Sequence, residues 1–181
     1  MQLQPDSAAI ARHSSETSAY LTQLGISHSI VAHDEVFTVD AMLQQPAVAK
    51  LPGCTLKNLF LKDKKRRLFL LSARHDAQIR LSDLHKRLPA GLAAGSFRLA
   101  EEPTLLDTLG VRQGCVTPLD LANDAAKLVT FLCDSALLEP AETEQLNCHP
   151  VGCNAATLSL SVPDFVGFLS DTGHEPVRLQ L

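Results

Sequence analysis

The sequence lacks the signals that direct a chain into a membrane or a secretory pathway. Its longest apolar runs, such as LFLLSA at 68–73, are far too short to span a bilayer. The first residues, MQLQPDSAAIARH, do not combine a basic start with an apolar stretch, so no secretory signal is predicted. The five cysteines are odd in number and form no C-x-x-C pair, which favours free thiols in a reducing cytoplasm over a disulfide framework.

Common catalytic motifs are missing as well. The sequence has no G-x-G-x-x-G, no G-x-x-x-x-G-K-[ST], no H-E-x-x-H and no G-x-S-x-G. Cys148, His149 and Cys153 lie close together in the chain, but no second cluster supplies the remaining ligands of a zinc site. A thiol enzyme that uses Cys148 would need a third group to orient the cysteine–histidine pair. We therefore expect neither a metal nor another cofactor, and thiol alkylation tests the alternative.

Charge is unevenly distributed along a chain whose net charge is −4. Residues 50–98 hold twelve of the sixteen Lys and Arg and only three acids, a local balance of +9, and the remainder carries −13. This asymmetry predicts one electropositive face on an otherwise acidic body. Such a face suits weak, transient contact with phosphates, although a solvated basic hairpin would show the same pattern.

Hydrophobic periodicity predicts alternating helices and strands in one domain that spans residues 1–181. The expected helices cover 6–24, 37–45, 81–88, 101–110 and 162–173. The expected strands are 27–33, two strands within 51–72 joined by the turn KDKKR, 126–134, 157–161 and 175–181. Because some strands form a hairpin and others are separated by helices, we expect a mixed sheet and not a doubly wound parallel one.

Three segments place polar residues where a purely structural role is hard to assign. Lys57 and Asn58 interrupt an apolar strand, so the lysine must either reach past the sheet to water or point into a site. In GVRQGCVTP (110–118), two glycines allow positive φ and a proline fixes the exit, so this loop is either a tight connection or a presenter of backbone groups to a small ligand. His149 before Pro150 is either structural or a hydrogen-bonding partner of a substrate.

Together these segments resemble the free-standing prolyl-tRNA editing proteins of the YbaK-like superfamily, from about Leu21 to Leu181. The family pattern K-N-L-F-L-x-D is matched letter for letter at Lys57–Asp63. The G-x-x-x-P loop corresponds to Gly114 and Pro118, and the late His–Pro pair to His149–Pro150. In this order and spacing the motifs are specific to the family.

The resemblance implies an α+β fold with a mixed, largely antiparallel, barrel-like sheet flanked by helices. It also implies a cytoplasmic enzyme that hydrolyses mischarged alanyl-tRNA(Pro). Lys57 would engage the terminal ribose or phosphate of the tRNA, supported by Asn58. Gly114, with Pro118 in its loop, would hold the aminoacyl group, and His149 would border it. The partners implied are the acceptor end of aminoacyl-tRNA and prolyl-tRNA synthetase, with a monomer as the default.

The chain departs from the family pattern after the late histidine. Cys153 stands where the family has asparagine, Asn154 follows one place later, and Ala156 replaces the first of two threonines. If the loop shifts by one residue, Asn154 would take the substrate-binding place. Two alternatives therefore stay open: a deacylase for another mischarged tRNA, such as cysteinyl-tRNA(Pro), and a non-catalytic module that binds tRNA or a synthetase.

For the reaction itself, the residues favour positioning over a protein nucleophile. An aminoacyl ester is activated and needs an oriented water and donors for the developing oxyanion. We expect the tRNA's own 2′-hydroxyl to assist, with backbone N–H groups near Gly114 and the charge of Lys57 as the donors. Selection for alanine would rest on pocket size, shaped by small residues such as Val116 or Ala155, which excludes proline.

Overall fold

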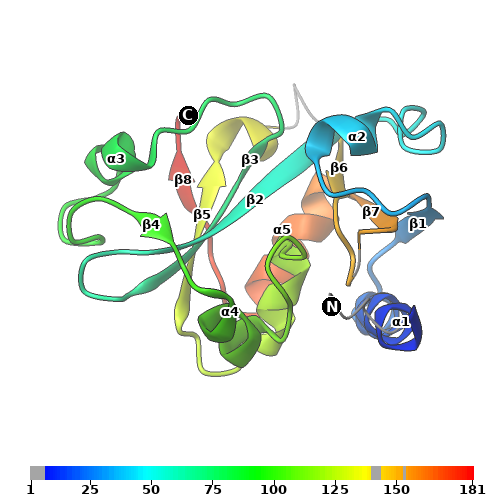
Figure 1. The fold of residues 1–181 in the computed structure, drawn as a ribbon, viewed down its shortest axis with the longest axis horizontal. Helices are drawn as coiled ribbons and strands as arrows, with labels where there is room; N and C mark the ends of the chain where they lie inside the picture. Colours follow the sequence, from blue (N-terminus) through cyan, green and yellow to red (C-terminus); the bar gives the residue numbers. More distant parts are fainter. Residues whose placement is uncertain (1–6, 140–143, 153) are drawn as a thin grey trace, which may run out of the picture.

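A computed structural model describes residues 7–139, 144–152 and 154–181 (Figure 1). Helices and strands alternate along the chain. The helices are α1 (Ser7–Gln23), α2 (Val39–Leu43), α3 (Leu81–Leu84), α4 (Glu102–Leu109) and α5 (Val162–Asp171), with short 3-10 helices η1 (His85–Arg87), η2 (Pro118–Asn123) and η3 (Ser135–Leu137). The strands are β1 (His28–Ala32), β2 (Cys54–Lys62), β3 (Leu68–Arg74), β4 (Arg98–Leu99), β5 (Val129–Asp134), β6 (Gln145–Cys148), β7 (Ala156–Ser161) and β8 (Val177–Leu179).

The strands form one mixed sheet in the order β1-β7-β6-β2-β3-β5-β8, and β4 joins it by pairing with β2. The hairpin β2–β3 and the pair β6–β7 are antiparallel, whereas β2–β6, β3–β5 and β5–β8 are parallel. The expected mixed α+β architecture is therefore confirmed. The sheet is open rather than a closed barrel, because its end strands β1 and β8 do not pair within the described part of the chain.

Helices pack on both faces of this sheet. Alternate residues of β2 point to opposite faces, so Leu56 and Phe60 join the main core with α1, α4 and α5, whereas Leu61 joins a second cluster with the α3 segment. Ser161 caps the N-terminus of α5, because its hydroxyl accepts from the N–H of Asp164, and Pro163 lies in the first turn, where a missing N–H costs nothing. No helix within the described ranges is long and apolar enough to cross a membrane.

The expected boundaries differ from the structure mainly where elements are short. The four-residue strand β6 and the two-residue strand β4 were not expected, and η2 lies in what appeared as loop. The hairpin turn falls at 63–67, one residue later than KDKKR, because β2 continues through Lys62. Asp6, the expected start of the first helix, lies outside the described residues.

Candidate functional site

A pocket of about 430 Å³ lies over the middle of β2, where segments from several parts of the chain converge. We call it the central pocket. Its described lining residues are Val36, Phe37, Thr38, Val39, Leu56, Lys57, Asn58, Leu59, Phe60, Leu99, Ala100, Leu105, Gln113, Gly114, Val116, His149, Pro150 and Asn154. Among these residues only Lys57 carries a formal charge at neutral pH, and none has a carboxylate. The pocket therefore offers an apolar wall, one cation and a few neutral polar groups.

The central pocket exists because one edge of β2 is left unpaired in its middle. On this edge β2 pairs with β6 at Cys54 and Thr55, and with β4 at Leu61 and Lys62, so residues 56–60 have no strand partner there. We call this interval the β2 gap. The edge peptides still point outward across it, as the Phe60 carbonyl does when it accepts from the N–H of Ala100.

Peptide groups alternate in direction along a strand, so those of Leu56 and Asn58 point the same way as the peptide group of Phe60. The other edge of β2 agrees with this direction. The carbonyl oxygen of Thr55 points toward β3, where it accepts from the N–H of His75, so the next residue, Leu56, points the other way. Sheet edges normally present unpaired N–H and C=O groups to any extended partner. Here they are presented to a pocket, where they can meet a ligand.

Lys57 lies on the wall of the central pocket, partly buried. Its ammonium group donates a hydrogen bond to the carbonyl oxygen of Ala77. Burial lowers the pKa of Lys57, and attraction to Asp76 partly offsets this effect. An ammonium group has three hydrogens. The bond to the Ala77 carbonyl uses one of them, and Ala77 itself is not among the lining residues of the central pocket.

The side chain of Asn58 links β2 to β3 and to the residue that follows β6. Its Oδ1 accepts from the hydroxyl of Ser72 on β3 at 2.8 Å, and its Nδ2 donates to the carbonyl oxygen of His149 at 3.3 Å. The second bond lies where the chain has just left β6 and no longer pairs with β2. The side-chain amide of Asn58 thus replaces a backbone ladder bond and fixes the far wall of the β2 gap, which explains an asparagine in the middle of an apolar strand.

The 110–118 loop takes the conformation that its glycines predict. Gly110 and Gly114 have φ of +72° and +82°, a region that L-residues avoid. Gly114 lines the central pocket, so its peptide groups are close to any ligand there. Pro118 does not line the pocket; it is buried at the start of η2, where Thr117 and Asp120 form a capping box.

His149 borders the pocket immediately after β6. Burial, and then the neighbouring His33, lower the pKa of His149 to about 4, against the opposing hydrogen bond to the Ala156 carbonyl. The imidazole is therefore neutral at physiological pH. Its Nδ1 lies 3.1 Å from the carbonyl oxygen of Ala156 and 3.1 Å from Oγ1 of Thr157, and the His33 ring lies 5.2 Å away between centroids.

Asn154 also lines the central pocket. Its carbonyl oxygen accepts from the N–H of Val36, and the next carbonyl, of Ala155, accepts from His33, which extends the β1–β7 pairing toward the pocket. Of the two small residues expected to shape the pocket, Val116 lines it and Ala155 is absent from the lining. Cys153, which occupies the family's asparagine position, lies outside the described residues.

Cys148 is ill suited to nucleophilic chemistry. It is fully buried in the main core, and burial raises the pKa of its thiol to about 12. Nucleophilic cysteines are instead partly exposed and have lowered pKa values. The structure therefore disfavours the thiol-enzyme alternative.

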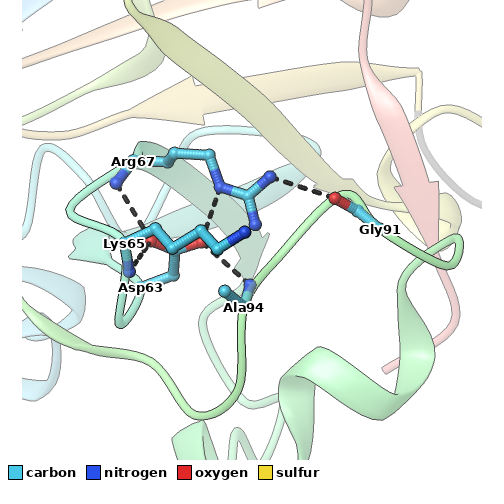
Figure 2. Close-up of polar contacts among 5 residues, drawn as sticks. All are labelled: Asp63, Lys65, Arg67, Gly91 and Ala94. Carbon is cyan, nitrogen blue, oxygen red and sulfur yellow. Dashed lines mark hydrogen bonds and ion pairs between the residues drawn. The ribbon is translucent and has the colours of Figure 1, made fainter.

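Asp63, the last residue of the K-N-L-F-L-x-D pattern, organises the tip of the basic hairpin (Figure 2). Its carboxylate accepts from the N–H groups of Lys65, Arg67 and Ala94 and from Nε of Arg67, at 2.7–3.0 Å. Arg67 also donates to the carbonyl of Gly91. Burial acts to raise the pKa of Asp63, but these bonds outweigh it and hold the pKa below its ordinary value.

One consequence concerns the exposed cations of this turn. Lys64, Lys65 and Arg66 are all exposed, and Arg66 has a positive φ of 63°. Because the carboxylate fixes the loop from inside, the turn holds these three cations together on a rigid tip. We call them the hairpin-tip cations.

Two groups at the site were not foreseen from the sequence. His33 and Thr157 stand behind His149, and the segment 36–39 covers one side of the central pocket. The register β1–β7, with Ala32 opposite Ala156, brings His33 and Thr157 together. A strand pairing was the only signal able to reveal them, since neither residue belongs to a local motif.

Comparison with known proteins places this geometry in a family. The sequence matches the aminoacyl-tRNA editing domain over residues 33–168. It is 45% identical over 164 residues to prolyl-tRNA synthetase associated domain-containing protein 1 of zebrafish (Danio rerio), covering 91% of this chain and 85% of that protein. The cattle (Bos taurus) protein of the same name is 46% identical over 160 residues, covering 88% of this chain and 90% of that protein.

A bacterial relative has a more explicit name. Prolyl-tRNA editing protein ProX of Acetoanaerobium sticklandii is 30% identical over 166 residues, covering 90% of this chain and 94% of that protein. Among solved structures, a hypothetical protein superposes with a TM-score of 0.66 at 17% identity, covering 91% of this chain and 98% of that one, which shows a common fold. Because the matched segment contains every lining residue of the central pocket, we conclude that the chain belongs to the aminoacyl-tRNA editing domain family.

Proposed function

We propose that this protein hydrolyses the ester bond of mischarged alanyl-tRNA(Pro). The observation that carries the proposal is the central pocket itself. It brings together Lys57, Asn58, Gly114, His149 and Asn154, which come from three distant segments of the chain. Family membership supports tRNA editing as the process. The name of the bacterial relative supports prolyl-tRNA as the substrate class.

The chemistry proposed is attack by water on the ester carbonyl carbon. The carbon–oxygen ester bond breaks, alanine leaves, and the ribose hydroxyl regains its proton. The negative charge that develops on the carbonyl oxygen needs preorganised donors. The N–H groups at the β2 gap, the Gly114 loop and the ammonium of Lys57 supply them. The 2′-hydroxyl of the terminal ribose helps to orient the water, so no protein nucleophile is needed.

The pocket walls favour a small amino acid. Val36, Leu56, Phe60 and Val116 provide apolar surface, and the lining lacks a carboxylate that would draw in a basic side chain. An apolar pocket discriminates chiefly by size. We attribute the rejection of proline to steric exclusion. The loop around Asn154 is the part of the wall whose sequence departs from the family pattern, so cysteinyl-tRNA(Pro) is the second candidate substrate.

The hairpin-tip cations provide a place for the tRNA backbone. Lys64 lies seven residues from Lys57 along the hairpin, roughly 23 Å at about 3.3 Å per residue. Stacked nucleotides advance about 3.4 Å each along a strand, so this span corresponds to roughly seven nucleotides. With the 3′-terminal adenosine at Lys57, the tip would reach phosphates of the acceptor stem. We propose that the protein acts as a cytoplasmic single-domain monomer, assisted by prolyl-tRNA synthetase.

The proposal is tested by following the loss of label from alanyl-tRNA(Pro), prolyl-tRNA(Pro), cysteinyl-tRNA(Pro) and alanyl-tRNA(Ala). We expect rapid release from the first substrate only. Lys57→Ala should lower the rate about 10²–10³-fold, as loss of one oxyanion donor does elsewhere. Lys50→Ala is the matched control, because Lys50 is exposed, lies in the same basic segment and is not part of the pocket lining.

Other outcomes would point elsewhere. Release of cysteine instead of alanine would show that the altered loop has changed the substrate. Binding of tRNA without any release would indicate a non-catalytic module. Equal rates for Lys57→Ala and the wild type would remove the lysine from the mechanism.

A further inference from the structure

A chain of hydrogen bonds runs behind the central pocket from Asp34 to Ala156. Nδ1 of His33 lies 2.8 Å from the carbonyl oxygen of Asp34, and its Nε2 lies 3.0 Å from Oγ1 of Thr157. The same Oγ1 lies 3.1 Å from Nδ1 of His149, which also faces the carbonyl oxygen of Ala156 at 3.1 Å. Thr157 is fully buried, so its hydroxyl has no competing water.

The two ends of this chain determine where every hydrogen lies. A carbonyl oxygen only accepts, so Nδ1 of His33 must donate to Asp34 and Nδ1 of His149 must donate toward Ala156. In a neutral ring the other nitrogen is then a bare acceptor. The Thr157 hydroxyl therefore donates to Nε2 of His33, and its oxygen accepts from Nδ1 of His149. With both rings in the neutral form, only one direction satisfies all the atoms.

This direction leaves Nε2 of His149 as the far end of the hydrogen-bond chain, without a hydrogen of its own. It has no hydrogen-bond partner among the described residues, and it belongs to a residue that lines the central pocket. The pocket lining contains no carboxylate that would compete for a ligand's donors, so a bare imidazole nitrogen is available as an acceptor for an N–H or O–H group there.

We infer that Thr157 and His33 are positioning residues that hold His149 with its hydrogen on Nδ1, so that Nε2 accepts a hydrogen bond from the α-ammonium group of the aminoacyl ester, from the attacking water or from the 2′-hydroxyl. The inference rests on the proposed deacylase function for its kinetic consequence. The tautomer itself is a property of the free protein. The ligand groups concerned are the α-ammonium of the amino acid and the water or 2′-hydroxyl.

The hydrogen-bond chain predicts an unusual pattern of effects among variants. In His33→Phe the Thr157 hydroxyl loses its acceptor and becomes free to donate to Nδ1 of His149, which stabilises the tautomer with hydrogen on Nε2. Adding Thr157→Val removes this competing donor, so the double variant should regain the Nδ1–H tautomer through Ala156. The two substitutions are therefore coupled and not additive. Thr157→Ser retains the hydroxyl and should behave as the wild type.

The first measurement is the pair of imidazole ¹⁵N shifts of His149 in long-range ¹H–¹⁵N spectra at pH 7, assigned with His149→Gln. We expect a single Nδ1–H tautomer in the wild type and in Thr157→Ser, and a shift toward Nε2–H in His33→Phe that Thr157→Val reverses. A hydrogen on Nε2 in the wild type would overturn the inference. So would a spectrum that His33→Phe leaves unchanged.

The second measurement is single-turnover deacylation of alanyl-tRNA(Pro) by the same variants. We expect His33→Phe to lower the rate about tenfold, the value of one hydrogen bond, and the double variant to be no slower. Losses that multiply in the double variant would contradict coupling. If no variant and no wild type releases alanine, the proposed function fails while the tautomer result still decides the positioning role. N-acetylalanyl-tRNA(Pro), which lacks the ammonium, distinguishes the two ligand groups.

Discussion

The side-chain amide of Asn58 donates to the main-chain carbonyl of His149, 3.3 Å away and 91 residues later in the chain. This single contact ties the middle of β2 to the residue that follows β6. It lies where the two strands have stopped pairing. This contact therefore helps to set the width of the β2 gap and the position of His149.

Replacing Asn58 should separate the effect of its hydrogen bond to His149 from the effect of its hydrogen bond to Ser72. Asn58→Asp keeps an acceptor for Ser72 but places a carboxylate against the His149 carbonyl, so we expect a loss of about 1–3 kcal/mol in unfolding free energy and a strong loss of deacylation. Ser72→Ala removes only the other bond and serves as the control. Urea unfolding and single-turnover rates give both values. Similar activity losses in the two variants would argue against a special role for the His149 contact.

Gly114→Ala should affect activity more than stability. No atom lies within 4 Å of an added Cβ, but φ is +82°, so the cost is backbone strain of about 1–2 kcal/mol and a shift of the loop. Gly25→Ala is a matched control, with φ of +73°, equally open space and a position after α1, away from the pocket. Both variants should melt at lower temperature, and only Gly114→Ala should lose deacylation. Full activity of Gly114→Ala would exclude the loop from the site.

The low pKa of His149 makes a pH prediction for stability. Its pKa falls from 6.5 in the unfolded chain to about 4 in the folded one. Between these values the unfolded state binds more protons, so the unfolding free energy contributed by this group decreases as pH falls from about 6.5 to about 4. His149→Gln should flatten this part of the profile. Urea titrations at pH 7 and pH 5 test it, and parallel profiles for the two proteins would contradict the assignment.

The hairpin-tip cations should contribute to tRNA affinity and little to the ester chemistry. Lys65→Glu should weaken binding of tRNA and lower the salt slope of log K by at least about 0.7–0.9, the share of one phosphate contact. Arg178→Glu makes the same charge change on β8, outside the basic segment, and should have a smaller effect. Filter binding at several salt concentrations measures both. Equal slopes would place the tRNA backbone elsewhere.

Sequence reasoning was most successful where a residue contradicts its local setting. Lys57 and Asn58 stood out because they interrupt an apolar strand, and the structure shows that they line the pocket. The mixed sheet followed from the order of helices and strands. Thr157 gave no such signal, since it fits an alternating strand, and His33 stood at the end of another. Their connection arises from the β1–β7 register, which no local pattern encodes.

The short strand β6 was missed for a related reason. Four residues that include Asn147 and Cys148 carry too little periodicity to distinguish a strand from a loop. Yet β6 frames one end of the β2 gap, so the gap could not be foreseen either. Pro118 shows the opposite case, in which a motif residue is buried in η2 and does not line the central pocket.

The strand pairing at both ends of the β2 gap also bears on how the proposed substrate preference could change. Strand pairing holds β2 at both ends of an interval of five residues, about 16 Å long. Side chains on the rim, such as Val116 or Asn154, can then be exchanged without moving the backbone that carries the peptide donors. Under the proposed function, substrate choice and catalysis would then depend on different parts of the molecule. If the proposed deacylase activity is confirmed, substitutions on the rim would change the amino acid that is removed without disturbing the backbone donors.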